Sequence, residues 1–191
     1  LADTPAIGAS GAVEGWMPFG RVFETLTWGR RHVVMGANQV DRHGNQNLSA
    51  FGPLQHPTRQ MFGVRGAPGN TINHATSYWV GNHTSRVFCD AVDVVSGIGW
   101  DKVDSDNPAY RFVNVYRVVS NLGVFDFGGP GRTMRAVSLH PGVDADDVRA
   151  NTTFDVHGLD EAPSTRLPTG EELDLIRTID PKGLRDKEVK L

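Results

Sequence analysis

Apolar and polar residues alternate most clearly in the middle of the chain. Residues 113–119 and 124–127 are rich in valine and aromatic residues, and the stretch 120–123 between them carries Ser, Asn and Gly. This pattern predicts two β-strands joined by a turn. Five shorter apolar runs are further strand candidates: 32–35, 48–51, 60–64, 86–89 and 134–139. The runs at 32–35 and 86–89 are mostly apolar, which is typical of buried strands.

Helix signals gather near the end of the chain. Asp144 can cap a short helix that runs to Asn151. Thr169 and Glu172 have the spacing of a capping box, in which each side chain accepts a backbone N–H of the other residue. An apolar helix face follows this box at Leu173, Ile176 and Ile179.

Glycine, proline and charge indicate how the chain is divided. Residues 1–20 are rich in Gly, Ala and Pro and are expected to form a loop, whereas 182–190 is a charged tail or solvated helix. A β-rich α/β domain with many glycine loops is predicted over residues 1–160. A Pro-containing linker and a C-terminal helical arm are predicted over 161–191. Leu1 stands where a complete chain would begin with Met, which indicates processing, truncation or preceding residues.

Composition narrows the classes of protein. The chain has 191 residues and a net charge of -3, which argues against disorder and against a broad basic surface for nucleic acid. Cys89 is the only cysteine, so no intrachain disulfide can form and a reducing, cytoplasmic location is expected. No signal peptide is visible, and no apolar run approaches the ~20 residues of a membrane span.

Candidate general bases are limited by the distribution of carboxylates. The chain has six glutamates, but none lies between Thr25 and Asp160. A base or nucleophile in the middle of the chain would therefore be an aspartate. The aspartates available there are Asp90, Asp93, Asp101, Asp104 and Asp126. The seven histidines show no ligand spacing, so no metal site is expected.

Two polar stretches could bind a ligand. In the first, 37–47, carboxamides such as Gln39 and Asn45 flank the turn sequence 41–44, and they either reach a pocket or satisfy backbone groups. In the second, 64–73, Gly66 and Gly69 would let backbone N–H groups approach an anion or oxyanion, although a plain Gly-Pro turn is the alternative. Four arginines could meet phosphates or simply face solvent: Arg30, Arg31, Arg59 and Arg65.

Several segments together resemble the β subunits of class I CoA-transferases. Residues 39–47 (QVDRHGNQN) are similar to a QVD-x-x-GN-x-N segment of that family, and 65–69 (RGAPG) takes the place of its glycine-rich loop. The family's ending is matched by three further segments: 122–127, 139–143 and 147–154. The resemblance covers roughly residues 32–157. It implies an α/β, three-layer CoA-transferase-like fold of the NagB/RpiA type in a single domain.

Within this family, the chain is most similar to the β subunits of ring-cleaving CoA-thioester hydrolases of steroid degradation. The segments that carry this resemblance are 14–21, 63–79 and 93–99. It implies an α2β2 heterotetramer with an α subunit and hydrolytic opening of the last steroid ring in cholesterol catabolism. It also implies that water adds to a ring ketone and that a carbon–carbon bond then breaks. Coenzyme A would be part of the substrate, and no other cofactor is expected.

The resemblance also assigns roles. The transferases use a β-subunit glutamate in a short Glu-x-Gly turn, and neither Glu14 nor Glu24 matches that turn. The hydrolase resemblance implies a catalytic glutamate on the partner α subunit, so no catalytic residue is assigned in this chain. The expected substrate-binding residues are Gln39, Asn45, Arg65, Gly66, Gly69, Asn70 and Asn73. Two alternatives remain: a β subunit of an acyl-CoA:carboxylate CoA-transferase, and a non-enzymatic binding or scaffold subunit.

Overall fold

The computed structural model describes residues 16–187 of the chain, which forms two compact units divided after Arg31. In the first unit, α1 (Phe19–Thr27) begins after Pro18. The rings of Phe19 and Phe23 pack edge to face with centroids 5.3 Å apart. The loop expected over residues 1–20 is therefore wrong at its end, because aromatic side chains four residues apart share a helix face. Residues 1–15 of that expected loop, including Glu14, lie outside the described residues.

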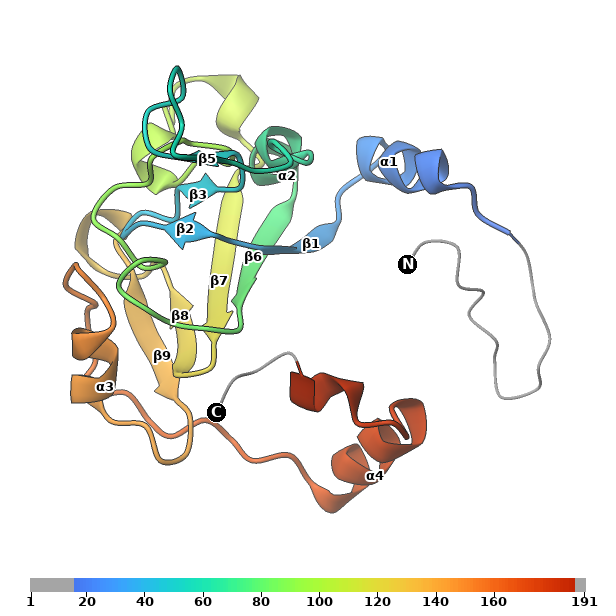
Figure 1. Cartoon of the computed structure of the whole chain (residues 1–191), viewed down its shortest axis with the longest axis vertical. Helices are drawn as coiled ribbons and strands as arrows, with labels where there is room; N and C mark the ends of the chain where they lie inside the picture. The colour runs from blue at the N-terminus through green and yellow to red at the C-terminus, as the bar shows by residue number, and fades with distance from the viewer. Residues whose placement is uncertain (1–15, 188–191) are drawn as a thin grey trace. The chain divides into compact units, whose positions relative to one another are not determined.

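The second unit is built on a five-stranded mixed sheet in the order β1-β6-β7-β8-β9 (Figure 1). Its strands are β1 (His32–Gly36), β6 (Ala75–Val80), β7 (Asn114–Ser120), β8 (Gly123–Asp126) and β9 (Arg135–Leu139). The first three run parallel, and β8 and β9 continue as antiparallel neighbours. Four of these strands confirm the predictions at 32–35, 113–119, 124–127 and 134–139. The mixed sheet with its helices confirms an α/β fold.

The sequence pattern did not predict β6, although it pairs with both β1 and β7. Hydroxyls explain the difference, because three successive buried residues of β6 carry one, Thr76, Ser77 and Tyr78, and each hydroxyl has a partner outside the strand. The Thr76 hydroxyl donates to the Asn70 carbonyl at 3.0 Å, and the Tyr78 hydroxyl donates to the Gly44 carbonyl at 3.0 Å. These two hydroxyls connect the sheet to the segments that contain Asn70 and Gly44.

The core lies on one face of the sheet. Buried side chains on this face include Tyr78, Val118 and Phe125, each with no exposed surface. The other face is open to solvent in the described part of the chain, where Val34 is 68% exposed and Tyr116 is 43% exposed. The expectation that 32–35 is fully buried is wrong, because β1 is an edge strand with one face covered.

Two short antiparallel ribbons, each of two strands, lie between β1 and α2 in the sequence. The first consists of β2 (Gln39–Val40) and β3 (Gln46–Asn47), and the second of β4 (Ala50–Phe51) and β5 (Arg59–Gln60). The candidate at 48–51 is thus a strand in its last two residues, and the candidate at 60–64 only in its first. The predicted strand at 86–89 is wrong. The N–H groups of Val87 and Phe88 both bond the Thr84 carbonyl in a turn, which leaves a single bridge from Phe88 to Val40.

The helices differ in how well the sequence predicted them. In the polar stretch 64–73, α2 (Ala67–Asn73) forms where a loop or turn was expected, with Gly66 as its N-cap. Both predicted C-terminal helices are confirmed, α3 (Ala145–Ala150) after Asp144 and α4 (Gly170–Ile179) after the predicted capping box of Thr169 and Glu172. The structure adds a second capping box between Asp144 and Asp147. Four single-turn 3-10 helices complete the set among the described residues: Trp100–Lys102, Pro108–Tyr110, Pro130–Arg132 and Leu184–Lys187.

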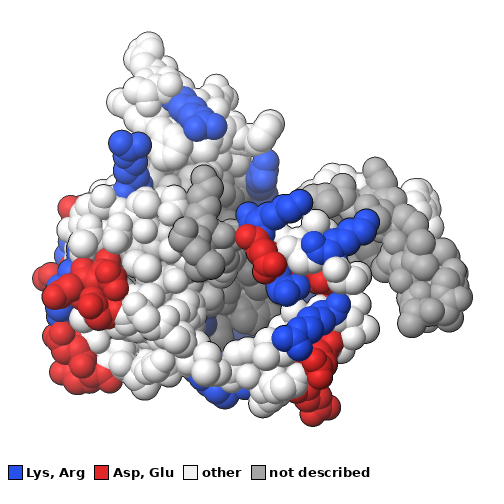
Figure 2. Space-filling model, turned by 60° about the horizontal axis from the view of Figure 1, so that its bottom comes forward, with Lys and Arg blue, Asp and Glu red and all other residues white. Residues whose placement is uncertain are grey.

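The segment expected to be a linker is bound to the edge of the sheet. It runs beside β9, since the Leu139 N–H donates to the Pro163 carbonyl and the Thr165 N–H donates to the Leu139 carbonyl. Acidic residues gather over α3 and the segment that follows it (Figure 2). The exposed members are Asp144, Asp146, Asp147, Asp155, Asp160 and Glu161. The 3-10 turn at Leu184–Lys187 lies in the charged tail, and residues 188–190 of that tail lie outside the described residues. No described helix has the length and hydropathy of a membrane span.

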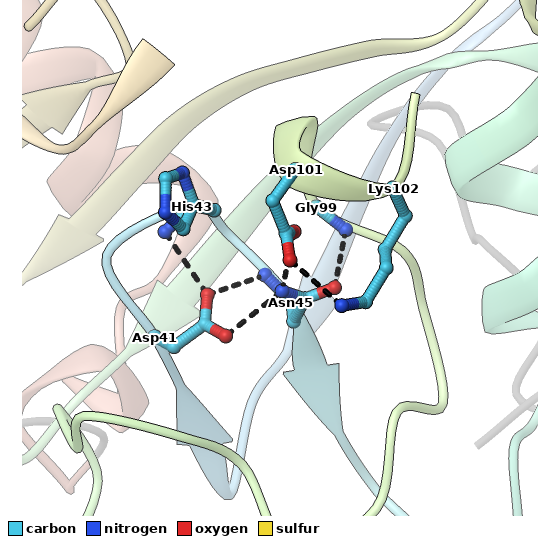
Figure 3. Close-up of polar contacts among 6 residues, drawn as sticks. All are labelled: Asp41, His43, Asn45, Gly99, Asp101 and Lys102. Carbon is cyan, nitrogen blue, oxygen red and sulfur yellow. Dashed lines mark hydrogen bonds and ion pairs between the residues drawn. The ribbon is translucent and has the colours of Figure 1, made fainter. Parts of the chain in front are cut away.

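The turn between β2 and β3 is held by one carboxamide (Figure 3). The Asn45 amide donates to Asp41 at 2.8 Å and to Asp101 at 2.7 Å, and its oxygen accepts the Gly99 N–H at 2.8 Å. The expected turn at 41–44 is confirmed, with Gly44 at φ 84°. A Cβ on Gly44 would lie 2.6 Å from the Phe127 ring, so both space and conformation require glycine.

A buried histidine joins three segments of the second unit. The His83 ring stacks on Phe88 with centroids 3.4 Å apart. Its Nδ1 bonds Ser120 at 2.9 Å and its Nε2 bonds Thr152 at 3.0 Å. Burial lowers the pKa of His83 to about 3, because the charged imidazolium would lose its hydration.

The lowered pKa of His83 predicts a pH-dependent stability. Between about pH 6.5 and pH 3 the unfolded chain binds a proton at this histidine that the folded chain excludes. The folded state is therefore progressively destabilised as the pH is lowered from 6.5 towards 3. We expect this residue to contribute a loss of about 1.4 kcal/mol in the free energy of unfolding per pH unit below 6.5. Urea unfolding at pH 7 to 5 measures it. His83→Gln should remove this part of the slope and the exposed His56→Gln should retain it; equal slopes would contradict the prediction.

The Asn45 contacts predict a structural role that substitution can measure. Asn45→Ala would leave Asp41 Oδ2 and the Gly99 N–H without their partner, while Asp41 Oδ1 keeps its two backbone donors, and we expect a cost of about 2–4 kcal/mol. Asn73→Ala is the matched control, since the exposed Asn73 amide bonds only the Gly69 carbonyl of its own helix. Its expected cost is below about 0.5 kcal/mol. Urea midpoints compare the two variants, and similar losses would refute the assignment.

Candidate functional site

A cavity of about 700 Å³ opens where the parallel strands β1 and β6 end. Gly36, the last residue of β1, and Val80, the last of β6, both line it. Ligands of open α/β sheets bind at the carboxyl ends of parallel strands, and this volume suits a small organic molecule. About half of the wall is apolar, with side chains that include Met35, Leu48, Phe51, Met61, Trp79, Val80 and Val87.

The polar side chains of the cavity are amides and guanidinium groups only. They belong to Asn38, Asn70, Asn82, Arg59 and Arg65. Among the described residues that line the cavity there is no carboxylate, imidazole, thiol, hydroxyl or amine. This wall can enclose an apolar ring, donate hydrogen bonds and oppose negative charge. It offers no group that could abstract a proton or attack a carbonyl.

Two of the amides are engaged by methionine sulfur. Asn70 Nδ2 lies 3.2 Å from Met35 Sδ, and Asn38 Nδ2 lies 3.1 Å from Met61 Sδ. A thioether is a weak acceptor, so these contacts orient the amides at little energetic cost when a better acceptor arrives. Asn70 is 7% exposed, which fixes its side chain at the cavity wall. The two amides are thus positioned donors for a ligand oxygen.

The structure brings together only two of the expected substrate-binding residues. Arg65 and Asn70 both line the cavity, whereas Gly66, Gly69 and Asn73 belong to or cap α2 and are not among the lining residues. The Asn70 N–H bonds the Gly66 carbonyl within the first turn, so it does not point to a ligand. The stretch 64–73 therefore contributes side chains to the cavity, not a cradle of free backbone donors.

The remaining expected residues, Gln39 and Asn45, satisfy the polar groups of loops. The Gln39 oxygen accepts from the Asn47 amide at 2.6 Å and from the Asp93 N–H at 3.0 Å, and its amide donates to Asp93 at 3.1 Å. Asn45 lines a separate cavity of about 460 Å³, together with Asp41 and Asp101. Its donors and its oxygen are already occupied there, as in Figure 3.

The aspartates considered as bases lie outside the main cavity and have structural partners. Burial would raise the pKa of Asp126, but hydrogen bonds from Arg135 and the Gly128 N–H lower it overall. Burial would also raise the pKa of Asp101, but hydrogen bonds from Lys102 and Asn45 lower it overall. Burial raises the pKa of the Cys89 thiol to about 11, which makes it a poor nucleophile at neutral pH. Across residues 16–187, no three potential metal ligands form a cluster.

Three cavity residues were missed as candidates: Asn38, Trp79 and Asn82. Asn38 follows the end of β1, and Asn82 follows the end of β6. The rule that ligands bind at the carboxyl ends of parallel strands would have pointed to both residues. It could not be applied, because β6 was not recognised in the sequence.

Comparisons with known proteins place the chain in a family, although no family model matches it. It is 78% identical to the cholesterol ring-cleaving hydrolase IpdB subunit of Mycobacterium tuberculosis, over 100% of this chain and 78% of that protein. It is 72% identical to the subunit of the same name from Rhodococcus jostii, over 100% of this chain and 76% of the relative. The crystal structure of Rhodococcus jostii IpdAB matches with a TM-score of 0.91, covering 100% of this chain and 77% of the solved one.

More distant proteins share the fold. A glutaconate CoA-transferase from Acidaminococcus fermentans is 23% identical and superposes with a TM-score of 0.71, covering 88% of this chain and 67% of its own. The CoA-transferase-like α/β fold is therefore shown. The high identity over the whole chain is far more specific than these distant matches, and the chain belongs to the IpdB subunit family of cholesterol ring-cleaving hydrolases.

Proposed function

We propose that the chain is the β subunit of a heteromeric hydrolase that opens the last steroid ring of a CoA-thioester intermediate by C–C bond hydrolysis. The single observation that supports it most is the 72–78% identity to IpdB subunits over the whole chain. The composition of the main cavity agrees with a subunit that binds and orients a substrate but lacks the reactive group. Coenzyme A would enter as part of the substrate, and water would be the only co-reactant.

The proposed reaction needs a base that the described cavity wall does not offer. A carboxylate would take a proton from water, whose oxygen then bonds to the carbon of a ring ketone. The adjacent C–C bond breaks, its electron pair forms an enolate that is then protonated, and the ketone carbon becomes a carboxylate. We assign the carboxylate to a glutamate of the partner α subunit, because the described lining residues include no acid.

This chain would act on the charges that develop during the reaction. An apolar wall that includes Met35, Phe51 and Trp79 would hold the ring, and the amides of Asn38, Asn70 and Asn82 would donate to carbonyl or enolate oxygens. Donors that are fixed before the reaction stabilise developing negative charge by up to ~3–4 kcal/mol each.

A partner subunit also agrees with the surface of the second unit. The solvent-facing side of the sheet carries Val34, and α4 exposes Leu175, Ile176 and Ile179. Apolar side chains exposed in this number are typical of surfaces that assemble. The crystal structure of IpdAB is, by its name, that of a two-component protein. We propose an α2β2 heterotetramer located in the cytoplasm.

A CoA-transferase β subunit is the second candidate. A 3-oxoadipate CoA-transferase subunit of Pseudomonas knackmussii is 24% identical over 87% of this chain and 65% of its own length. A transferase of this class carries CoA on a glutamate, whose position in the family would fall before Leu1. The much lower identity favours the hydrolase.

Reconstitution tests the proposed function. The chain should show no turnover of a ring-bearing CoA thioester alone, because its described cavity wall has no base. With an IpdA-type α subunit it should consume the thioester and release a carboxylate, detected by mass spectrometry with incorporation of ¹⁸O from labelled water. CoA transfer to an added acid would instead support the transferase. Turnover by the isolated chain would refute the assignment of the base to the partner.

Asn70 distinguishes a substrate-binding subunit from a scaffold. Asn70→Ala in the reconstituted complex should lower kcat/KM by about tenfold to a hundredfold, since a positioned donor is lost. Asn73→Ala is the control from the same helix, because its amide bonds Gly69 and does not line the cavity. Melting temperatures of both complexes verify assembly. Unchanged turnover with Asn70→Ala would favour the scaffold alternative.

A further inference from the structure

The cavity contains two cationic side chains whose charge no acid of the described residues balances. Arg59 and Arg65 both line it, and neither forms an ion pair within residues 16–187. By contrast, Arg117 and Arg135 both pair with Asp126 on the sheet. Two unpaired guanidinium groups beside an apolar wall create a positive potential that attracts anions.

The backbone around Arg65 is held in a conformation that a non-glycine residue rarely adopts. Arg65 has φ 49°, and the neighbouring Gly63 and Gly66 have φ 82° and 81°. Such a left-handed conformation costs on the order of 1 kcal/mol at a non-glycine residue. The turn therefore directs the Arg65 side chain toward the cavity at an energetic cost, as residues that bind ligands often do.

The Arg65 side chain is supported in a way that leaves its donors available. Its guanidinium carbon lies 4.9 Å from the centroid of the Phe62 ring, which is 89% exposed. A guanidinium stacked on a ring uses its face, so its N–H groups still point outward in the plane. Carboxylates and phosphates bind that edge through two parallel hydrogen bonds.

Arg59 comes from a different element and is fixed independently. It belongs to β5 and pairs with Phe51 of β4, which also lines the cavity. The strand pairing sets the backbone of Arg59, whereas the turn before α2 sets that of Arg65. Two cations on separate supports define a subsite, which a single mobile surface arginine would not.

We propose that Arg59 and Arg65 form an anion subsite of this cavity that binds a negatively charged oxygen group of the acyl-CoA ligand. The inference rests on the proposed function for the identity of the ligand. Two groups have the required chemistry: the phosphates of coenzyme A and a free carboxylate on the acyl part, such as the one that ring hydrolysis generates. The role is positioning, since neither guanidinium supplies a base.

The test measures binding of two probes to the reconstituted complex by isothermal titration calorimetry. Coenzyme A carries phosphates without a free carboxylate, and 3-(2-oxocyclohexyl)propanoate carries a carboxylate without phosphate. Arg65→Gln and Arg59→Gln should each raise the Kd of one probe by about tenfold or more, since a charge-assisted hydrogen bond is lost. The affected probe identifies the anion, and Arg65→Lys should restore part of the affinity.

Arg177→Gln is the matched control, because Arg177 is an exposed arginine of α4 that does not line the cavity. It should leave both affinities unchanged. The unaltered complex gives a second measurement that needs no variant: the affected probe should bind more weakly as NaCl rises from about 50 to about 500 mM. Salt-independent binding, or equal losses in Arg177→Gln and Arg65→Gln, would overturn the inference.

The outcome is separable from that of the proposed function. If the complex cleaves the ring-bearing thioester but both arginine variants bind the probes and turn over as the unaltered complex does, the anion subsite is wrong and the hydrolase assignment stands. If the complex does not cleave the thioester but the variants still lose affinity for a probe, the subsite stands without that function.

Discussion

The second unit depends on the turn between β2 and β3, because its carbonyls bind three separate parts of the fold. The Arg42 carbonyl accepts the Met134 N–H at 2.7 Å, the His43 carbonyl accepts the Trp100 N–H at 2.9 Å, and the Gly44 carbonyl accepts the Tyr78 hydroxyl at 3.0 Å. Asn45 keeps these carbonyls in place through Asp41, Asp101 and Gly99. A buried turn needs hydrogen-bond partners for its carbonyls, and this one finds them by joining sheet, ribbon and loops, although the buried His43 Nδ1 has no partner among the described residues.

The placement of that turn explains why the cavity lies where it does. The turn bonds Tyr78 of β6, and α2 leads directly into the start of β6 (Figure 1). Gly36 and Val80, the last residues of β1 and β6, line the cavity together with Asn70 of α2. The side-chain amides of Gln39, Asn45 and Asn47 are engaged by hydrogen bonds within the fold. The cavity draws its polar side chains from Asn38, Asn70, Asn82, Arg59 and Arg65. Neighbouring residues of one segment thus differ in position: Asn38 lines the cavity, whereas Gln39 bonds groups within the fold.

The chemistry of the cavity agrees with a division of labour between two subunits. A wall of apolar groups, amides and guanidinium groups can bind an anionic ligand with a ring and stabilise negative charge. An acid in the same wall would pair with the arginines and weaken their attraction for an anion. In the proposed function, a carboxylate on the partner chain would keep the two roles apart until the subunits assemble around a substrate.

The sequence alone determined the elements whose signals are local. Alternating valines predicted β7 and β8, and the spacing of Asp144 and of Thr169 with Glu172 predicted α3 and α4, because strands and capped helices are specified by neighbouring residues. The similarity to a hydrolase subunit family was also visible in short segments. Arg65 and Asn70 were expected from the sequence to bind substrate, and both line the cavity.

Only the tertiary structure decided which polar residues line the cavity. Gln39, Asn45 and Asn70 are all carboxamides in polar stretches, and nothing local distinguishes them. Their partners do: Asp93 for Gln39, Asp101 for Asn45 and Met35 for Asn70, each more than 30 residues away in the sequence. Strand β6 was missed for the same reason, because Thr76 and Tyr78 are buried with polar groups whose acceptors come from other segments. A hydrogen bond between distant residues exists only once the chain has folded.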